Sequence, residues 1–246
     1  MANPLLNRLR SKDKKGLFKS SQTAVSYKTG FLPFDYRNGY AIEVRDMDEN
    51  LIETYQSLGI VGGTFVTIVG KSGTAKTTFA VQMASAIVRP FDSGLVQHFD
   101  LEQALNYTRI KNITGWKQQE LVDKYILKQE DNYIDDIFDA IIEIATAKEE
   151  DPETFKYDSG LKDEFGDPIR LYVPTVLIID SIPTLASKDK GKMQLEGSTY
   201  ANRAAKDIAQ FYKRLMPVIK KFNIIVVAIN HINTKIEINP KPIGAL

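Results

Sequence analysis

The sequence predicts an α/β fold in which a mostly parallel β-sheet is flanked by helices on both faces. Short apolar runs alternate with helical patterns along the 246 residues, and such alternation is typical of parallel strands joined by helical crossovers. With 43% hydrophobic residues, the chain is long enough to bury one substantial core. We therefore expect one globular domain.

The first half of the chain predicts two strands and two helices. "TFVTIV" at 64–69 is a run of β-formers, and "KTTFAVQMASAIV" at 76–88 favours a helix that ends before Pro90. "GLVQHFD" at 94–100 predicts the second strand, and a short helix is expected at about 102–111.

The second half continues the alternation. "KYILKQ" at 124–129 predicts a strand, and apolar residues recur at helical spacing over 132–148. "TVLIID" at 175–180 and "NIIVVAIN" at 223–230 read as buried strands, separated by a long helix at about 197–221.

Composition limits the classes of protein that remain. A net charge of +1 does not indicate a nucleic-acid binder, because such domains often carry a clear basic excess. The absence of cysteine excludes disulfides and thiolate metal sites. The N-terminus lacks an apolar signal region, and no apolar run is long enough to span a bilayer. We expect a cytoplasmic protein without a membrane partner.

A phosphate-binding loop is predicted between the first strand and the first helix. The P-loop pattern is Gly, four residues, Gly, Lys and then Ser or Thr, and its backbone N–H groups surround the phosphates of a nucleotide. Ala75 replaces the second glycine. Because this residue enters the helix, we expect a negative φ that suits alanine. The expected nucleotide-binding residues are Gly70, Lys71, Ser72, Gly73, Thr74, Ala75, Lys76, Thr77 and Thr78.

Lys76, Thr77 and a distant acid are expected to hold the charged groups of the nucleotide. In P-loops the lysine neutralises the β- and γ-phosphates and the hydroxyl holds Mg²⁺. A second acid for the metal usually ends an apolar strand, and "PTVLIIDS" supplies Asp180. The sequence therefore predicts Mg²⁺ at Thr77 and Asp180.

Two acids and one histidine are candidates for the hydrolytic chemistry. Hydrolysis needs a base near the attacking water, and "HFDLEQAL" offers Asp100 and Glu102 just past the second strand. Spacing does not decide between them. Asn230 and His231 end the last strand, where strand C-termini point at the ligand crevice. Either side chain could donate to the γ-phosphate there.

Taken in order, the motifs resemble the ATPase core of RecA-type recombinases. They are Thr29, Gly30, Asp35 and Gly39, the loop at 70–78, "FDLEQAL", "LIIDSIPTLAS" and "VVAINHINTKI". The phrases "IDSIPTLASK" and "AINH" are particularly similar to the phage branch, the UvsX-like recombinases. The likeness runs over about 28–246 and implies a RecA-like P-loop ATPase fold.

The resemblance implies roles for individual residues. ATP and Mg²⁺ would be the cofactors, and Glu102 would be the catalytic glutamate, with Lys76 and His231 beside it. His231 takes the place where RecA has glutamine, and it would couple the γ-phosphate to a DNA loop. Asn106 and Arg109 fall where the adenine-contacting residues of the family lie. The DNA-facing loops of the family match residues that include Lys188, Lys190, Lys192, Thr234 and Lys235.

By the same resemblance, the chain would be a DNA-dependent ATPase of recombination and repair. It would polymerise as a helical filament on single-stranded DNA and exchange strands with double-stranded DNA. Single-strand-binding and mediator proteins would be partners, and the host cytoplasm would be the location of a phage-encoded member. Two alternatives share this core: a ring-forming replicative helicase, and a non-catalytic ATP-binding mediator, which Ala75 and the short C-terminus favour.

We expect the chain to divide into an arm at 1–30 and a RecA-like core at 31–246. The arm has one acid, Asp13, against the basic residues Arg8, Arg10, Lys12, Lys14, Lys15, Lys19 and Lys28; it is either a solvated tail or a contact with DNA or a neighbouring subunit. A segment rich in Asp, Glu, Gly and Pro at about 149–173 is expected to be a surface insertion. Family members continue through further strands, so we expect a truncated or unusually short chain.

Overall fold

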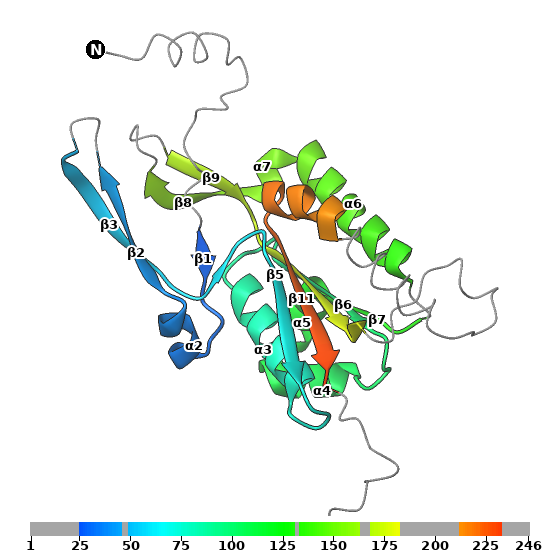
Figure 1. Cartoon of the computed structure of the whole chain (residues 1–246). Coiled ribbons are helices and arrows are strands. Elements are labelled where there is room, and N and C mark those ends of the chain that lie inside the picture. The colour runs from blue at the N-terminus through cyan, green and yellow to red at the C-terminus, as the bar shows by residue number, and fades with distance from the viewer. Residues whose placement is uncertain (1–24, 46–48, 131–132, 163–167, 183–211, 233–246) are drawn as a thin grey trace, which may run out of the picture.

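The computed structural model describes residues 25–45, 49–130, 133–162, 168–182 and 212–232. Its centre is a parallel sheet with the strand order β5-β11-β10-β6-β7 (Figure 1). The strands span Phe65–Gly70 (β5), Leu95–Asp100 (β6), Tyr125–Lys128 (β7), Thr175–Asp180 (β10) and Ile224–His231 (β11). The first and last residues of each strand lie within one residue of the range predicted from the sequence. The predicted parallel sheet is confirmed.

Helices cover both faces of this sheet, because successive side chains of a strand point to opposite faces. In β10, Val176 and Ile178 join one buried cluster, whereas Leu177 and Ile179 join the other. The first cluster is completed by α3 (Lys76–Val88), α4 (Tyr107–Thr114) and α5 (Gln118–Lys124), and the second by α6 (Ile134–Glu150) and the helical residues 212–221. No helix in the described part of the chain is long and apolar enough to cross a membrane.

The helix expected at about 102–111 begins later than the sequence pattern indicated. α4 starts at Tyr107, because Asn106 takes the N-cap position and its side chain accepts a hydrogen bond from the backbone of Arg109 at 2.8 Å. It ends at Thr114, and its C-cap is Gly115, whose φ of 64° suits glycine. α5 follows directly and was not predicted.

Residues 25–61 form small elements that the sequence patterns did not predict. They are β1 (Ser26–Tyr27), α2 (Leu32–Arg37), β2 (Tyr40–Arg45), β3 (Leu51–Ser57) and β4 (Ile60–Val61). β1 pairs with β4, and β2 and β3 form an antiparallel hairpin that extends away from the main sheet (Figure 1). The backbone N–H and the hydroxyl of Thr29 donate to one carboxylate oxygen of buried Asp35, at 2.9 and 2.6 Å. This pair anchors the segment before α2.

The segment after α6 forms a second antiparallel hairpin. α7 spans Pro152–Phe155, β8 spans Lys156–Lys162 and β9 spans Pro168–Tyr172. β9 leads directly into β10, so the base of the hairpin lies at the N-terminal ends of the sheet strands. This is the edge opposite to the predicted phosphate loop.

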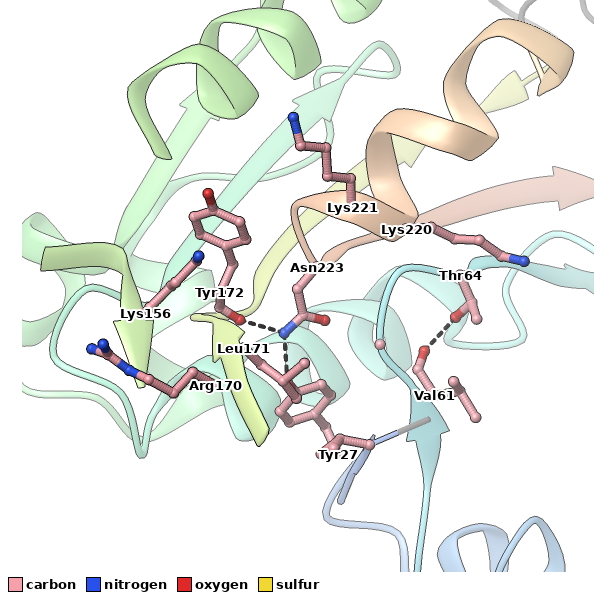
Figure 2. Close-up of a pocket in the computed structure, with 12 residues that line it drawn as sticks. Tyr27, Val61, Thr64, Lys156, Arg170, Leu171, Tyr172, Lys220, Lys221 and Asn223 are labelled. Atoms are coloured by element: carbon pink, nitrogen blue, oxygen red, sulfur yellow. Dashed lines mark hydrogen bonds between the residues drawn. The ribbon is translucent and has the colours of Figure 1, made fainter. Parts of the chain in front are cut away.

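A buried polar network ties the hairpin to this N-terminal edge (Figure 2). The amide of Asn223 donates to the hydroxyl of Tyr27 and to the carbonyl of Tyr172, the latter at 2.6 Å. The hydroxyls of Tyr27 and Tyr157 lie 2.8 Å apart. Burial raises the pKa of Tyr27 well above its usual 10.0, so its hydroxyl keeps its proton and the network is maintained.

Lys148 is almost fully buried near the end of α6, at 2% exposure. Its ammonium donates to the carbonyls of Val173 and Phe222, at 2.7 and 2.9 Å. These carbonyls precede β10 and β11, so one side chain joins the start of two central strands. Burial disfavours the charged form and lowers the pKa of Lys148 from 10.5 to about 7.

Replacing Lys148 with methionine should remove a pH dependence of stability. Between pH 7 and 9 the unfolded chain keeps the proton on this lysine, whereas the folded chain loses it, since the two pKa values are 10.5 and about 7. The unfolded state then binds more protons, so the free energy of unfolding rises with pH, by at most about 1.4 kcal/mol per unit. Denaturant unfolding at several pH values in this window measures the slope. Equal slopes in wild type and Lys148→Met would contradict the assignment.

Candidate functional site

The predicted site residues meet at the C-terminal edge of the sheet, because the strands are parallel and in register. Asp180 of β10 lies opposite Asp100 of β6, and His231 of β11 lies opposite Gly70 of β5. Residues separated by more than a hundred positions therefore occupy one edge, where ligands of parallel α/β folds bind.

The loop between β5 and α3 has the form of a phosphate cradle. Residues 71–75 are exposed to solvent, whereas Lys76 is only 7% exposed. The ammonium of Lys76 turns back into the loop and donates to the carbonyl of Lys71 at 2.8 Å, and the hydroxyl of Thr74 donates to the same carbonyl at 2.8 Å. Gly73 has a φ of 75°, which glycine adopts without steric cost. Ser72 lies within this loop, and Thr78 lies in the first turn of α3.

The expectation of a negative φ at Ala75 was wrong. Its φ is 61° and its ψ is 25°, in the left-handed region, and it is the N-cap of α3. The residue is not yet in the helix, because the chain still has to turn from the exposed loop into α3. A left-handed alanine costs on the order of 1–3 kcal/mol, which explains why the P-loop pattern has glycine at this position.

Thr77 and Asp180 form the part of the site that fits a divalent cation. The hydroxyl of Thr77 donates to Oδ2 of Asp180 at 2.6 Å. Asp180 is 1% exposed, and its Oδ1 has no hydrogen-bond partner among the described residues. Burial is the main reason that the pKa of Asp180 is raised, with Glu102 and Asp100 adding to it. A cation beside this carboxylate would relieve that penalty, and oxygen ligands suit Mg²⁺.

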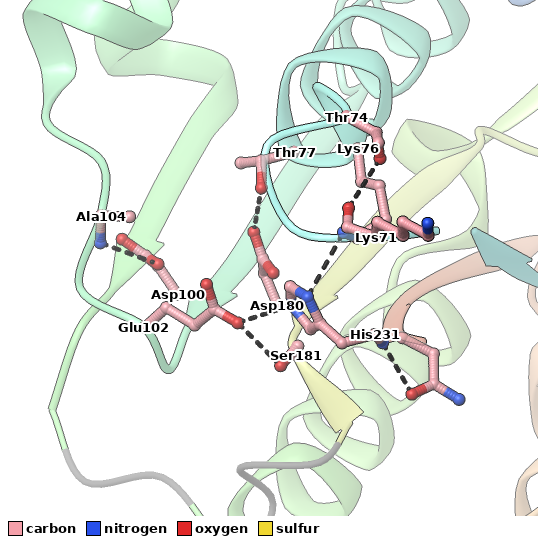
Figure 3. A network of polar contacts seen from close by, with 11 residues as sticks. Lys71, Thr74, Lys76, Thr77, Asp100, Glu102, Ala104, Asp180, Ser181 and His231 are labelled. Atoms are coloured by element: carbon pink, nitrogen blue, oxygen red, sulfur yellow. Dashed lines mark hydrogen bonds and ion pairs between the residues drawn. The ribbon is translucent and has the colours of Figure 1, made fainter. Parts of the chain in front are cut away.

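A continuous polar path leads from the loop to Glu102 (Figure 3). Lys76 Nζ lies 3.3 Å from His231 Nδ1, and His231 Nε2 lies 2.8 Å from Glu102 Oε1. Because an ammonium only donates hydrogen bonds, Nδ1 is the acceptor, and a neutral imidazole then carries its proton on Nε2. Nε2 lies close to the carboxylate but does not have the geometry of a hydrogen bond. One possible metal-ligand atom from each of Glu102, Asp180 and His231 lies within 4.8 Å of the other two.

Ser181 is a contact of this site that the sequence reasoning missed. Its hydroxyl donates to Glu102 Oε1 at 3.0 Å, so the same carboxylate oxygen faces both Ser181 and His231. The available signal was its position immediately after Asp180, at the C-terminal end of a central strand. Ser181 and His231 together orient the Glu102 carboxylate.

The structure distinguishes the two acids that follow β6. Both oxygens of Asp100, which is fully buried, accept hydrogen bonds: from the backbone of Ala104 and Leu105, at 3.2 and 2.9 Å, and from the side chain of Gln129 at 2.8 Å. Asp100 therefore shapes the loop before α4. Glu102 is exposed and is the acid that faces the site.

The remaining predicted residues lie at the margin of the described site or outside it. Asn106 caps α4, and the guanidinium of Arg109 donates to the carbonyl of Ala104 at 3.3 Å. These contacts give both residues a structural role, and their contact with adenine stays a prediction. The expected DNA contacts lie outside the described residues; they are Lys188, Lys190, Lys192, Thr234 and Lys235.

Comparison with known proteins identifies one family. A family model described as "ATPase: KaiC" matches residues 42–197, which is more than half of the 246 residues. The matched range contains the phosphate loop, Glu102 and Asp180, whereas His231 follows it. No curated protein matches the chain.

Replacing Ala75 with glycine should stabilise the protein. Glycine adopts the left-handed φ of 61° without the Cβ penalty, so we expect a gain of about 1 kcal/mol and a rise of about 2–4 °C in melting temperature for a chain of this size. Differential scanning calorimetry measures both. The matched control is Ala86→Gly inside α3, where the same change should destabilise by about 1 kcal/mol.

Asp100→Asn and Glu102→Gln should separate a structural acid from an exposed one. The amide introduced by Asp100→Asn would place donors against backbone N–H groups, so we expect a loss on the order of 2–3 kcal/mol. Glu102→Gln changes an exposed side chain and should alter stability by less than about 0.5 kcal/mol. Denaturant unfolding of both variants tests this, and equal losses would contradict the division of roles.

Proposed function

The chain belongs to the KaiC family of ATPases, whose model covers more than half of it, and we propose that it acts as an ATP-driven DNA recombinase. Family membership makes it a RecA-like P-loop ATPase. The finer assignment, to recombinases of the phage UvsX-like branch, rests on the resemblance of "IDSIPTLASK" and "AINH". The observation that supports it most is the polar path from Lys76 through His231 to Glu102.

In the proposed reaction the phosphate loop holds ATP and Glu102 receives a proton from the attacking water. Lys76 leaves the Lys71 carbonyl and contacts the β- and γ-phosphates, whose charge it neutralises. Thr77 and Asp180 would hold Mg²⁺, which when bound neutralises phosphate charge. Glu102 is fixed by His231 and Ser181 on the side of the site that faces Asp180. A carboxylate held in this way is suited to orient water and accept its proton.

In the proposed coupling, His231 reports the γ-phosphate to the DNA-binding segments. Movement of Lys76 towards a phosphate would break its 3.3 Å contact with His231 Nδ1 and leave the imidazole free to rotate, so that its Nε2–H would donate to the phosphate. β10 ends at Asp180 and β11 ends at His231. The segments that follow these strands carry the expected DNA contacts, Lys188, Lys190, Lys192, Thr234 and Lys235.

The proposed partners follow from this coupling. Single-stranded DNA would contact the lysines of both segments, and double-stranded DNA would be searched and exchanged. A single subunit offers few phosphate contacts, so self-association into a filament would add many weak ones. In this proposal the basic arm at 1–30 contacts DNA or a neighbouring subunit, and residues 31–246 form the core. Single-strand-binding and mediator proteins would assist assembly.

One structural observation favours a second candidate function. A left-handed Ala75 places a methyl group at the position where the P-loop pattern has glycine, and this could weaken phosphate binding. In that case the chain would be a non-catalytic mediator that binds ATP and loads another recombinase. Negligible hydrolysis with single-stranded DNA present would favour the mediator.

Glu102→Gln should bind ATP and lose hydrolysis. A general base contributes about 10²–10⁴-fold to the rate, so we expect steady-state ATPase activity to fall at least about 100-fold, with ATP affinity nearly unchanged. Wild-type activity should rise when single-stranded DNA is added. Glu143→Gln, an exposed change on α6, is the matched control. Unchanged hydrolysis in Glu102→Gln would reject this role.

Electron microscopy with single-stranded DNA and a non-hydrolysable ATP analogue distinguishes the proposed recombinase from its alternatives. Helical filaments would support the recombinase. Closed rings would indicate a ring-forming helicase instead. Dispersed particles, together with negligible hydrolysis, would indicate the mediator.

A further inference from the structure

A second pocket lies at the N-terminal ends of the sheet strands (Figure 2). Thr64 precedes β5, Tyr172 precedes β10 and Asn223 precedes β11, and all three line it. Its volume is about 720 Å³, within the range of roughly 300–1,000 Å³ that is typical of small-molecule sites. β11 rises about 3.3 Å per residue, so its two ends are roughly 23 Å apart. The pocket is therefore separate from the phosphate loop.

Four cationic residues line this pocket, from two segments that are far apart in the sequence. Lys156 and Arg170 come from the β8–β9 hairpin, and Lys220 and Lys221 come from the end of the helix at 212–221. None of the described residues that line the pocket is acidic. Positive charge gathered in one concavity attracts anions.

Two of these cations have carboxylate partners and two do not. Arg170 contacts Glu153 at 3.5 Å, an exposed pair that contributes little. Lys221 pairs with Glu149 at 2.5 Å. Lys156 and Lys220 have no ion-pair partner within the described ranges. The pocket therefore keeps a positive charge that contacts among the described residues do not neutralise.

Lysines in the last turn of a helix often serve only to complement the helix dipole. That explanation suffices for Lys220 and Lys221, but it does not cover Lys156 and Arg170, which belong to a hairpin. Lys156 Nζ lies 4.9 Å from the ring centre of Tyr172, which keeps its ammonium near the pocket wall.

The wall of the pocket combines aromatic, apolar and polar side chains. Asn223 joins the hydroxyl of Tyr27 to the backbone of Tyr172, and Val61 and Leu171 add apolar surface. A fixed wall of this kind suits a flat or apolar group, whereas the cations at the rim suit an anion. Guanidinium and ammonium groups are the side chains that most often bind phosphate.

We propose that this pocket is a second phosphate site, which binds a phosphate group attached to a flat ring. Nucleotides have both parts, either free in solution or as the end of a nucleic-acid strand. The inference does not depend on the recombinase assignment, because none of the residues that line the pocket belongs to the ATP site.

Isothermal titration with AMP and with a short 5′-phosphorylated oligothymidylate tests the site. The test variant is Lys156→Glu with Lys220→Glu, and the charge-matched control is Arg37→Glu with Lys117→Glu, two exposed positions outside the pocket. We expect the test variant to bind at least about tenfold more weakly, since each charge-assisted hydrogen bond that is removed lowers the binding affinity strongly. The control should change binding less than about twofold.

Lys76→Ala separates the pocket from the phosphate loop. AMP binding that persists in Lys76→Ala and is lost in the pocket variant supports the second site and a free nucleotide as its source. Loss for the oligothymidylate alone supports the site with a nucleic-acid end as its source. Binding that depends on neither pocket lysine, or that falls equally in the control, overturns the inference. If the melting temperature of the double variant is well below that of wild type, the single variant Lys220→Gln is used in its place and should weaken binding about threefold or more.

Discussion

The parallel register of β10 with its two neighbours is the constraint on which the site depends. β10 lies between β11 and β6, and this register places Asp180 where Thr77 can donate to it, although the two residues are 103 positions apart. Side chains alternate between the faces of a strand, so a shift of one residue would exchange the two buried clusters and turn Asp180 away from Thr77. Packing of side chains on both faces of β10 therefore fixes the position of Asp180 at the C-terminal edge of the sheet.

The sequence predicted the inner strands β10 and β11 well because they are buried on both faces along nearly their whole length. Such strands appear as uninterrupted apolar runs, whereas the edge strands β5 and β7 include exposed positions. The elements at 25–61 carried no comparable signal: β1 and β4 have two residues each, and the β2–β3 hairpin is largely exposed. Their positions depend on tertiary contacts such as Thr29 with Asp35, which periodicity does not report.

At the site, the sequence predicted which residues meet but not how each is used. Asp100 and Glu102 are two positions apart, and only the hydrogen bonds accepted by Asp100 show that it belongs to the loop. The backbone of Ala75 could not be predicted, because a motif names residue types and not φ. The motifs assign no role to Ser181 either, although its hydroxyl donates to Glu102. Local geometry decided each of these cases.

The burial and pairing of β11 restrict the movements that this strand can make. Residues 224–229 are fully buried, and the strand is hydrogen-bonded to β5 on one side and β10 on the other. Sliding along its axis would break two ladders at once, and the smallest step that preserves both faces is two residues, or roughly 6.6 Å. Rotation of the His231 imidazole about its side-chain bonds is therefore the smaller movement at this end of β11, because it requires no displacement of the strand.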